Sequence, residues 1–125
     1  MITIAPRIPE KLKKQILACV TEDDWDDEGA IGITPEFCTI AIDFTNAVLN
    51  ADESIPLPHV SPSVFGTVTL AWRNGSEHLI VRPAKDSAYY RYESAWSTNS
   101  YGMDSLREVM LRVIKFYDGN RAEKG

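Results

Sequence analysis

Apolar residues recur with helical spacing in three segments of the chain, residues 9–21, 34–50 and 104–118. One helical turn takes about 3.6 residues, so apolar positions three and four apart fall on one face of an amphipathic helix. The second segment has so wide an apolar face that its helix is expected to pack on more than one partner. Ser105 and Glu108 have the spacing of a capping box at the start of the third. The pattern therefore predicts three helices.

The apolar pattern changes to alternation between the second and third of these segments. Residues 66–72 place apolar side chains at every second position, and residues 77–82 and 88–94 are the next two β-rich segments. Alternation of this kind is typical of a strand with one buried face. Asn74-Gly75 is a strong signal for a tight hairpin turn between the first two strands, because both residues tolerate a positive φ angle. We therefore expect three consecutive antiparallel strands.

The connections between these elements are expected to be irregular. Residues 51–64 contain three prolines, which restrict the chain to extended conformations, and residues 95–102 are expected to form a polar loop. The order α-α-β-β-β-α predicts an α+β fold, in which a three-stranded antiparallel meander carries helices packed on one face. A chain of 125 residues fits a single domain over residues 1–125.

The negative charge of the chain is concentrated in one segment. Six of the 18 acidic residues lie in residues 22–28, which leaves 12 acids against 13 lysines and arginines elsewhere. A nucleic-acid-binding face needs basic side chains to neutralise phosphates, so this balance argues against a nucleic-acid partner. The acidity is a local feature that needs a local explanation.

The sequence shows no pattern of a secretory signal or a membrane span. Arg7 interrupts the apolar N-terminus, and no segment approaches the roughly 20 apolar residues that cross a bilayer. Cys19 and Cys38 fall on or beside apolar helix faces and are expected to be buried, reduced thiols. We therefore predict a cytoplasmic protein that does not bind membranes.

The sequence also contains none of the short motifs that mark common catalytic or cofactor sites. There is no phosphate-binding loop, no nucleophile elbow, no zinc-binding H-E-x-x-H and no C-x-x-C pair. The two histidines, His59 and His78, are expected on the surface. We therefore predict no cofactor and favour a protein that is not an enzyme.

The acidic segment is the first candidate for a functional site. Clustered carboxylates supply the oxygen ligands that Ca²⁺ and Mg²⁺ prefer, and Asp24, Asp26 and Glu28 are the candidate metal ligands. Their spacing fits the start of an EF-hand loop, but Pro35 stands where that loop ends in a glutamate. The alternative is a solvated acidic turn, whose carboxylates cap a helix or pair with a lysine.

Aromatic residues mark candidate partner-binding surfaces. Trp25 lies within the acidic segment, where it either anchors the segment on the core or belongs to a binding surface, because tryptophan is enriched at such surfaces. Trp96 and Tyr101 lie in the predicted polar loop. Alternation divides the residues of the third strand between two faces, one of which is expected to face the core. The two sets are Tyr90 with Tyr92, and Tyr89 with Arg91.

Short motifs rich in tryptophan, proline and tyrosine follow one another along the chain. They read Trp25-Asp26-Asp27-Glu28-Gly29-Ala30, Leu57-Pro58-His59-Val60-Ser61-Pro62, Gly66-Thr67-Val68-Thr69-Leu70-Ala71-Trp72, Tyr89 to Tyr92, and Tyr101-Gly102. This series, within residues 20–118, resembles a family of small, uncharacterised bacterial proteins. Ala71 stands where such proteins often carry an acid. Because no activity is established for that family, the resemblance supports the architecture and singles out residues 25–30 for testing.

Three hypotheses about function follow from these patterns. The first is a non-catalytic interaction module, such as an antitoxin, an inhibitor or an accessory subunit, that binds another and preferably basic protein. Its candidate contact residues are Trp25, Asp26, Glu28, Trp96 and Tyr101. The alternative is an enzyme with a carboxylate or divalent-metal site at residues 22–28. The third is a homo-oligomer formed by pairing of exposed strand edges.

Overall fold

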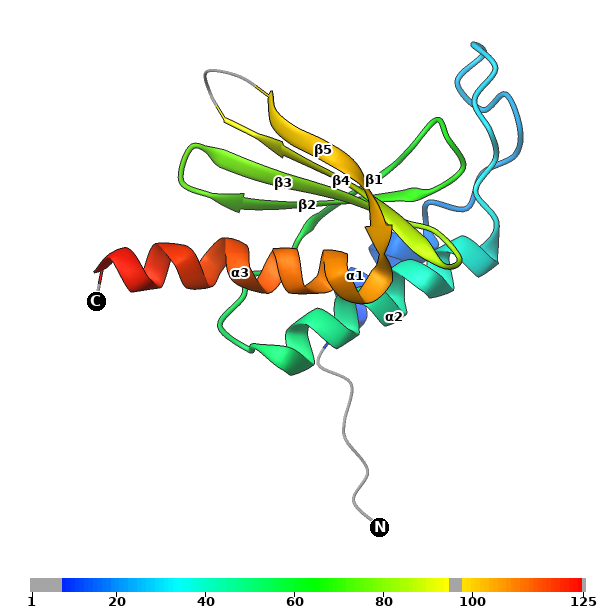
Figure 1. Ribbon diagram of the computed structural model, residues 1–125. Coiled ribbons are helices and arrows are strands. Elements are labelled where there is room, and N and C mark those ends of the chain that lie inside the picture. Colours follow the sequence, from blue (N-terminus) through cyan, green and yellow to red (C-terminus); the bar gives the residue numbers. More distant parts are fainter. Residues whose placement is uncertain (1–7, 95–97, 125) are drawn as a thin grey trace.

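The computed structural model describes residues 8–94 and 98–124 of the chain (Figure 1). The described residues form three helices and five strands in the order α-α-β-β-β-β-β-α. The helices are α1 (Glu10–Leu17), α2 (Pro35–Ala51) and α3 (Leu106–Lys124), and the strands are β1 (His59–Pro62), β2 (Val68–Asn74), β3 (Glu77–Pro83), β4 (Ser87–Glu93) and β5 (Thr98–Ser105).

The sheet corrects the predicted fold. It has five strands in the spatial order β1-β2-β3-β4-β5, and every neighbouring pair is antiparallel, so the predicted three-stranded meander is wrong. The three predicted strands are its central members. The two strands that the sequence pattern missed, β1 and β5, are its edges.

Neither edge strand shows the alternation of apolar and polar residues that predicts a strand. β1 lies within the proline-rich connector, where Val60 pairs with Leu70 and Pro62 pairs with Val68; proline is tolerated there because an edge strand has one side without a ladder. In β5 the residue that faces Tyr90 is Gly102, and a Cβ atom there would approach the Tyr90 hydroxyl to 3.0 Å. With glycine on the inner face, β5 has no apolar repeat and reads as a polar loop.

The hairpin between β2 and β3 forms one residue later than predicted. Asn74 still pairs with Glu77, so Gly75 and Ser76 make the turn. Gly75 has a φ of +64°, and Asn74 does not adopt a positive φ. A positive φ at the first turn residue is the pattern of a type II′ turn, which requires glycine at that position.

The first helix is shorter than its apolar pattern predicts. α1 ends at Leu17, although the pattern runs on to residue 21. Thr21 instead pairs with Ile33: its N–H donates to the Ile33 carbonyl at 3.1 Å, and its Oγ1 accepts the Ile33 N–H at 3.0 Å. These two bonds hold the chain extended before the acidic segment, so the helix stops earlier.

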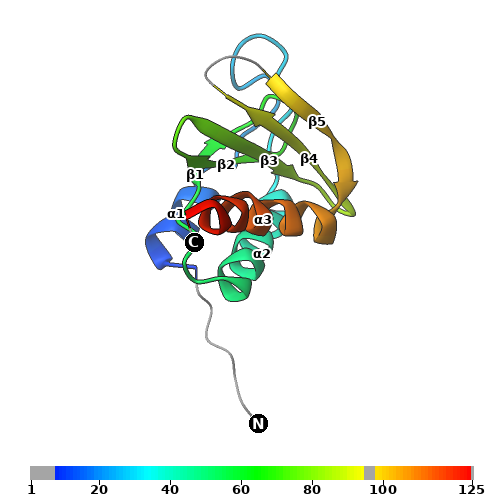
Figure 2. The ribbon, with the colours of Figure 1, turned by 60° about the vertical axis from the view of Figure 1, so that its left-hand side comes forward.

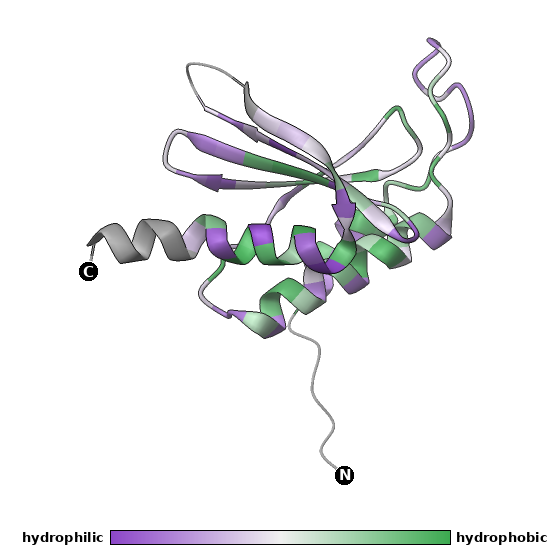
Figure 3. Ribbon diagram, in the orientation of Figure 1, coloured by the Kyte–Doolittle hydropathy of each residue, from purple (hydrophilic) through white to green (hydrophobic). Residues whose placement is uncertain are grey.

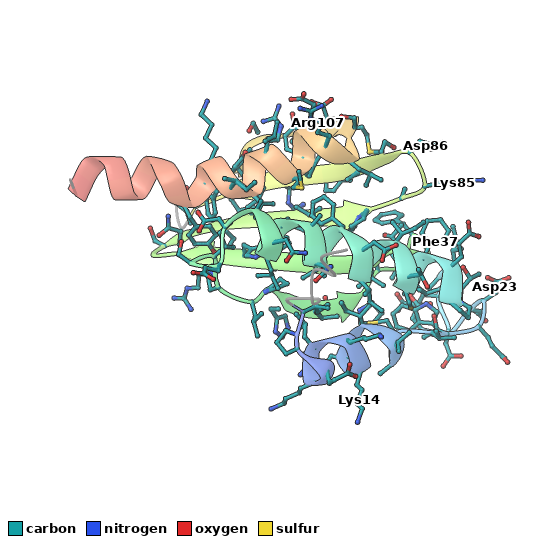
Figure 4. The ribbon with its side chains drawn as sticks, turned by 90° about the horizontal axis from the view of Figure 1, so that it is seen from below. Lys14, Asp23, Phe37, Lys85, Asp86 and Arg107 are labelled. Carbon is teal, nitrogen blue, oxygen red and sulfur yellow. The ribbon has the colours of Figure 1, made fainter. Side chains whose placement is uncertain are left out.

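All three helices lie on one face of the sheet. Figures 1 and 2 show the sheet above and the helices below in two views, and Figure 4 shows the helices in front of the strands. Apolar residues follow α2 and the parts of the strands that it faces (Figure 3). The fully buried side chains of the central strands that form this inner layer are Val68, Leu70, Trp72, Leu79 and Val81.

Trp72 is the largest side chain in this core. It is fully buried, its ring lies 6.3 Å from that of Phe44 on α2, and its indole N–H donates to the Pro56 carbonyl at 3.0 Å. A hydrogen bond joins α3 to the end of the same strand: the Tyr117 hydroxyl donates to the Arg73 carbonyl at 2.6 Å. Helices and sheet are thus joined by packing at the centre and by hydrogen bonds at the ends.

Two tyrosines define the inner face of β4. Tyr90 and Tyr92 pack against the core, which leaves Tyr89 and Arg91 on the side away from the helices. Within the described parts of the chain, no helix is both long and apolar enough to cross a membrane.

We predict that Trp72→Phe lowers the free energy of unfolding by about 2–3 kcal/mol, because it leaves a cavity beside Phe44 and removes the hydrogen bond to Pro56. Urea denaturation followed by circular dichroism measures this change. Tyr101→Phe, on an exposed side chain, should change stability by less than about 0.5 kcal/mol. Similar losses for both variants would contradict the assignment of Trp72 to the centre of the core.

Candidate functional site

Three of the six carboxylates of residues 22–28, here called the acidic loop, accept hydrogen bonds from the backbone of the loop and of the residues that follow it. The Oδ1 atom of Asp23 accepts the Gly32 N–H at 2.8 Å, and that of Asp24 accepts the Gly29 N–H at 2.7 Å. Backbone N–H groups in an irregular loop need acceptors, and ionised carboxylates are strong ones. The clustered acids therefore act as internal supports of the loop.

Asp26 makes the most such contacts. Its Oδ1 accepts the N–H of Glu28 at 2.9 Å and the N–H of Ala30 at 3.0 Å. These two bonds favour the ionised form and hold the pKa of the Asp26 carboxyl below its usual value. Asp24 and Asp27 adopt φ angles of +61° and +62°, a conformation that aspartate tolerates better than most residues.

Trp25 is also part of the loop's framework. Its side chain is half-buried, and its indole N–H donates to the Ile31 carbonyl at 3.2 Å. This bond joins the ring to the end of its own segment, so both interpretations, an anchor on the core and a part of a binding surface, stay predictions.

The candidate metal ligands do not converge. Asp24 and Asp26 each use one carboxylate oxygen for backbone N–H groups, and Glu28 contributes its own N–H to Asp26. Over residues 8–94 and 98–124, no group of three or more His, Cys, Asp or Glu side chains is arranged to hold a metal ion.

The end of the acidic loop is joined to the connection between β1 and β2. The Ile31 N–H donates to the Val64 carbonyl at 2.8 Å, and Ile31 pairs in parallel with Phe65. Gly66, with a φ of +82°, allows this approach, because a Cβ atom there would lie 2.8 Å from Ile31 Cγ2. The acidic loop is thereby fixed to the residues that enter the sheet.

The acidic loop rises at one end of the sheet, beyond its plane and away from the helices (Figure 1). Its outer part is hydrophilic (Figure 3). Asp23 lies at the same end of the sheet as Lys85 and Asp86, which form the turn between β3 and β4 (Figure 4). The loop therefore flanks the face of the sheet that the helices leave uncovered, here called the open face.

Apolar side chains gather on and beside the open face. Phe65 and Met103 line the same hollow, Tyr101 shares a face of β5 with Met103, and Ile31 pairs with Phe65. Exposed apolar side chains that gather in one region often mark an interaction surface, whereas single scattered ones do not. This apolar patch consists of Ile31, Val64, Phe65, Tyr101 and Met103, which are between 44% and 69% exposed.

A hollow of about 500 Å³ opens within the open face. It is bounded by the β1–β2 connection and by strands β3 to β5, so it exists only once the sheet has assembled. The residues that line it include Phe65, Thr67, Arg82, Tyr89, Arg91 and Met103.

Arg82 lies between two aromatic rings at this hollow. Its guanidinium carbon is 5.5 Å from the Phe65 ring centroid and 5.2 Å from that of Tyr89, and its Nε donates to Thr69 Oγ1 at 3.2 Å. Aromatic faces attract a guanidinium and hold it in a fixed plane. No carboxylate of the described residues forms a salt bridge with Arg82.

The other two polar groups of the hollow differ in how they are satisfied. Arg91 donates from Nε to Glu93 Oε1 at 2.8 Å, so its charge is compensated. The Thr67 hydroxyl oxygen is buried and has no hydrogen-bond partner among the described residues. A buried hydroxyl without a partner is unfavourable, since it has lost its bonds to water.

The sequence-based candidates therefore divide into separate groups. Trp25, Asp26 and Glu28 belong to the acidic loop, Tyr101 belongs to the apolar patch, and Trp96 lies outside the described residues. Sequence reasoning missed Phe65, Arg82 and Met103. The alternation that put Tyr89 and Arg91 opposite Tyr90 was the available signal, but it could not say which face stays open.

The two cysteines offer no reactive group. Both are buried and unpaired. Burial raises the pKa of the Cys19 thiol, and burial together with the neighbouring Cys19 raises the pKa of the Cys38 thiol. A raised pKa reduces the thiolate fraction at neutral pH, so neither thiol is activated as a nucleophile.

We predict that Asp26→Asn destabilises the protein at neutral pH but not in acid. The folded-state pKa of Asp26 is lowered, so its contribution is complete above the unfolded pKa of about 3.9 and is lost as the pH falls through the folded value. Denaturation from pH 7 to pH 2.5 should show the wild type and variant converging in acid. Asp27→Asn, whose carboxylate accepts no backbone hydrogen bond in the described structure, is the control. A pH-independent difference for Asp26→Asn would refute the role assigned to its hydrogen bonds.

Three comparisons with known proteins add nothing to this picture. No protein-family model matches the chain. Searches of curated proteins and of solved structures gave no match either. The assignment of function therefore depends on the geometry and chemistry of the open face and the acidic loop alone.

Proposed function

We propose that the protein is a non-catalytic interaction module that binds a basic protein through the apolar patch and the acidic loop. An antitoxin, an inhibitor or an accessory subunit would have this character. The observation that carries the proposal is the exposure of Phe65, Tyr101 and Met103, which are 65%, 69% and 60% exposed on one side of the molecule.

The apolar patch has the composition of the centre of an interface. Aromatic residues and methionine are enriched where proteins meet, and burial of such side chains supplies most of the binding free energy. Helices cover the other face of the same sheet, so the apolar residues there are already buried. A partner protein that covers the open face would bury this patch, as the helices bury the core.

The acidic loop determines the sign of the charge that the partner is expected to carry. Ile31 belongs to the patch and lies three residues after the end of the loop, so the two surfaces adjoin. The Asp23, Asp24 and Asp26 carboxylates accept backbone N–H groups, and these bonds fix their positions beside the patch. A partner with lysines or arginines around an apolar centre would meet this arrangement with complementary charge, and its association would slow as salt rises.

The enzyme alternative has no observation of its own in its favour. It places a carboxylate or a divalent metal at residues 22–28, where oxygens of Asp24 and Asp26 are engaged by the backbone. It stays a prediction, and a thermal shift on addition of Mg²⁺, Ca²⁺ or Mn²⁺ would favour it.

The test is capture of a partner from the native cell by the tagged protein, at low and at physiological salt. We predict that Phe65→Ser/Met103→Ser weakens capture at least about tenfold, because it removes two central apolar contacts. Leu17→Ser/Leu111→Ser, which changes exposed apolar residues on the helical side, should capture as the wild type does.

A second variant separates charge from apolar contact. Glu22→Gln/Asp27→Asn/Glu28→Gln removes three charges whose carboxylates accept no backbone hydrogen bond in the described structure. It should weaken capture at low salt and lose its difference from the wild type at high salt. Capture that is equal for all variants, or insensitive to salt, would overturn the proposal. Sedimentation of the protein alone shows whether the captured partner is a second copy of the chain.

A further inference from the structure

We propose that the hollow on the open face binds a single carboxylate group carried on an apolar body. This site shares Phe65 and Met103 with the apolar patch, but its argument and its test do not depend on the function proposed above. The inference combines the held guanidinium of Arg82, the uncompensated charge around it, the unpartnered Thr67 hydroxyl and the apolar walls of the hollow.

Arg82 is positioned in advance for planar recognition. The Phe65 and Tyr89 rings lie within 5.5 Å and 5.2 Å of the guanidinium carbon, and the bond from Nε to Thr69 fixes its rotation. An arginine that is already held loses little conformational freedom on binding. The two terminal nitrogens remain to donate in the plane of the group, which is the geometry that a carboxylate accepts with both oxygens.

The charge of the hollow fits one negative group. Arg82 has no salt-bridge partner among the described residues, whereas the charge of Arg91 is taken up by Glu93 at 2.8 Å. The lining and Glu93 together therefore carry one net positive charge. A monocarboxylate neutralises that charge, whereas a phosphate dianion would leave an excess negative charge at a partly desolvated site.

The Thr67 hydroxyl supplies a second polar contact. Thr67 lines the same hollow, and its buried hydroxyl oxygen lacks a partner in the described structure. A rotation about χ1 would turn this hydroxyl toward the hollow. A hydroxyl can donate to a carboxylate oxygen, so a ligand would satisfy a group that is unfavourable in the empty protein. A structural role for this hydroxyl would have required a bond that the fold does not make.

The remaining residues of the hollow favour a ligand with an apolar body. Phe65 and Met103 are exposed at its rim, and Ala84 lines it. Its volume of about 500 Å³ lies within the range of sites for small organic ligands, roughly 300–1,000 Å³. Such a ligand is either a free organic acid or the C-terminal residue of a polypeptide, since both place a carboxylate beside an apolar group.

The test is titration of the ¹⁵N-labelled protein followed by NMR, with three probes. The probes are 3-phenylpropionate as a free acid, N-acetylphenylalanine as a C-terminal residue, and 3-phenylpropionamide as the neutral control. At least one acid should shift the resonances of residues 65–67, 82 and 89, and the amide should bind at least about tenfold more weakly. The tighter acid identifies the source. Equal binding of acid and amide, or no binding of either acid, would overturn the proposal.

Two variants with the same loss of charge locate the site. Arg82→Gln should weaken acid binding at least about tenfold, because it removes the charged donors. Arg73→Gln, on an exposed arginine whose Nε bonds the Gly75 carbonyl, should leave binding unchanged. Equal losses in the two variants would show a general charge effect and contradict the site.

Thr67→Val separates a binding role from a structural one. Valine has the shape of threonine without the hydroxyl, so removing the unpartnered group should raise Tm by about 3 °C. The same change should weaken acid binding by about fivefold through the lost hydrogen bond. A lowered Tm would indicate that the hydroxyl has a structural partner, and unchanged acid binding would remove Thr67 from the site. Failure of partner capture would leave these results unaffected, so the two proposals can be told apart.

Discussion

The structure depends on the burial of one face of a five-stranded antiparallel sheet beneath three helices. Trp72 lies at the centre of that contact, packed on Phe44 and bonded to the carbonyl of Pro56. Because the helices all lie on one side, the opposite face keeps its own side chains in solvent. An antiparallel sheet normally fills such a face with small or polar residues. Here Tyr89, Tyr101 and Met103 stand there instead, and this departure directs attention to function.

The acidic loop illustrates how a functional-looking cluster can first be a structural device. A chain segment with positive φ angles at Asp24 and Asp27 leaves backbone N–H groups without regular partners. The neighbouring carboxylates accept those groups, and the Trp25 indole closes the loop on Ile31. The carboxylates keep their charge while they accept these hydrogen bonds, so the loop still presents a negative field at one end of the open face. Support of the loop by these carboxylates is therefore compatible with the proposed attraction of a basic partner.

Elements with a strong local pattern were predictable, and elements defined by their neighbours were not. α2 was expected over residues 34–50 and spans Pro35–Ala51, because a wide apolar stripe at helical spacing over so many residues does not fit a strand or a loop. β5 was missed because its inner residue is glycine and its apolar residues, such as Met103, point outward. Likewise, the hollow joins side chains from the β1–β2 connection and three strands. No sequence spacing could place Arg82 between two rings, since that arrangement arises from strand register.

The central claim is that the open face is the binding surface, and hydrogen–deuterium exchange tests it most directly. Exchange would be measured for the protein alone and with a partner captured from the native cell. The account predicts slower exchange in residues 22–31, in residues 63–67 and along β5 when the partner is bound, with little change in α1 and α2. Protection confined to the helices, with the open face exchanging as before, would contradict it.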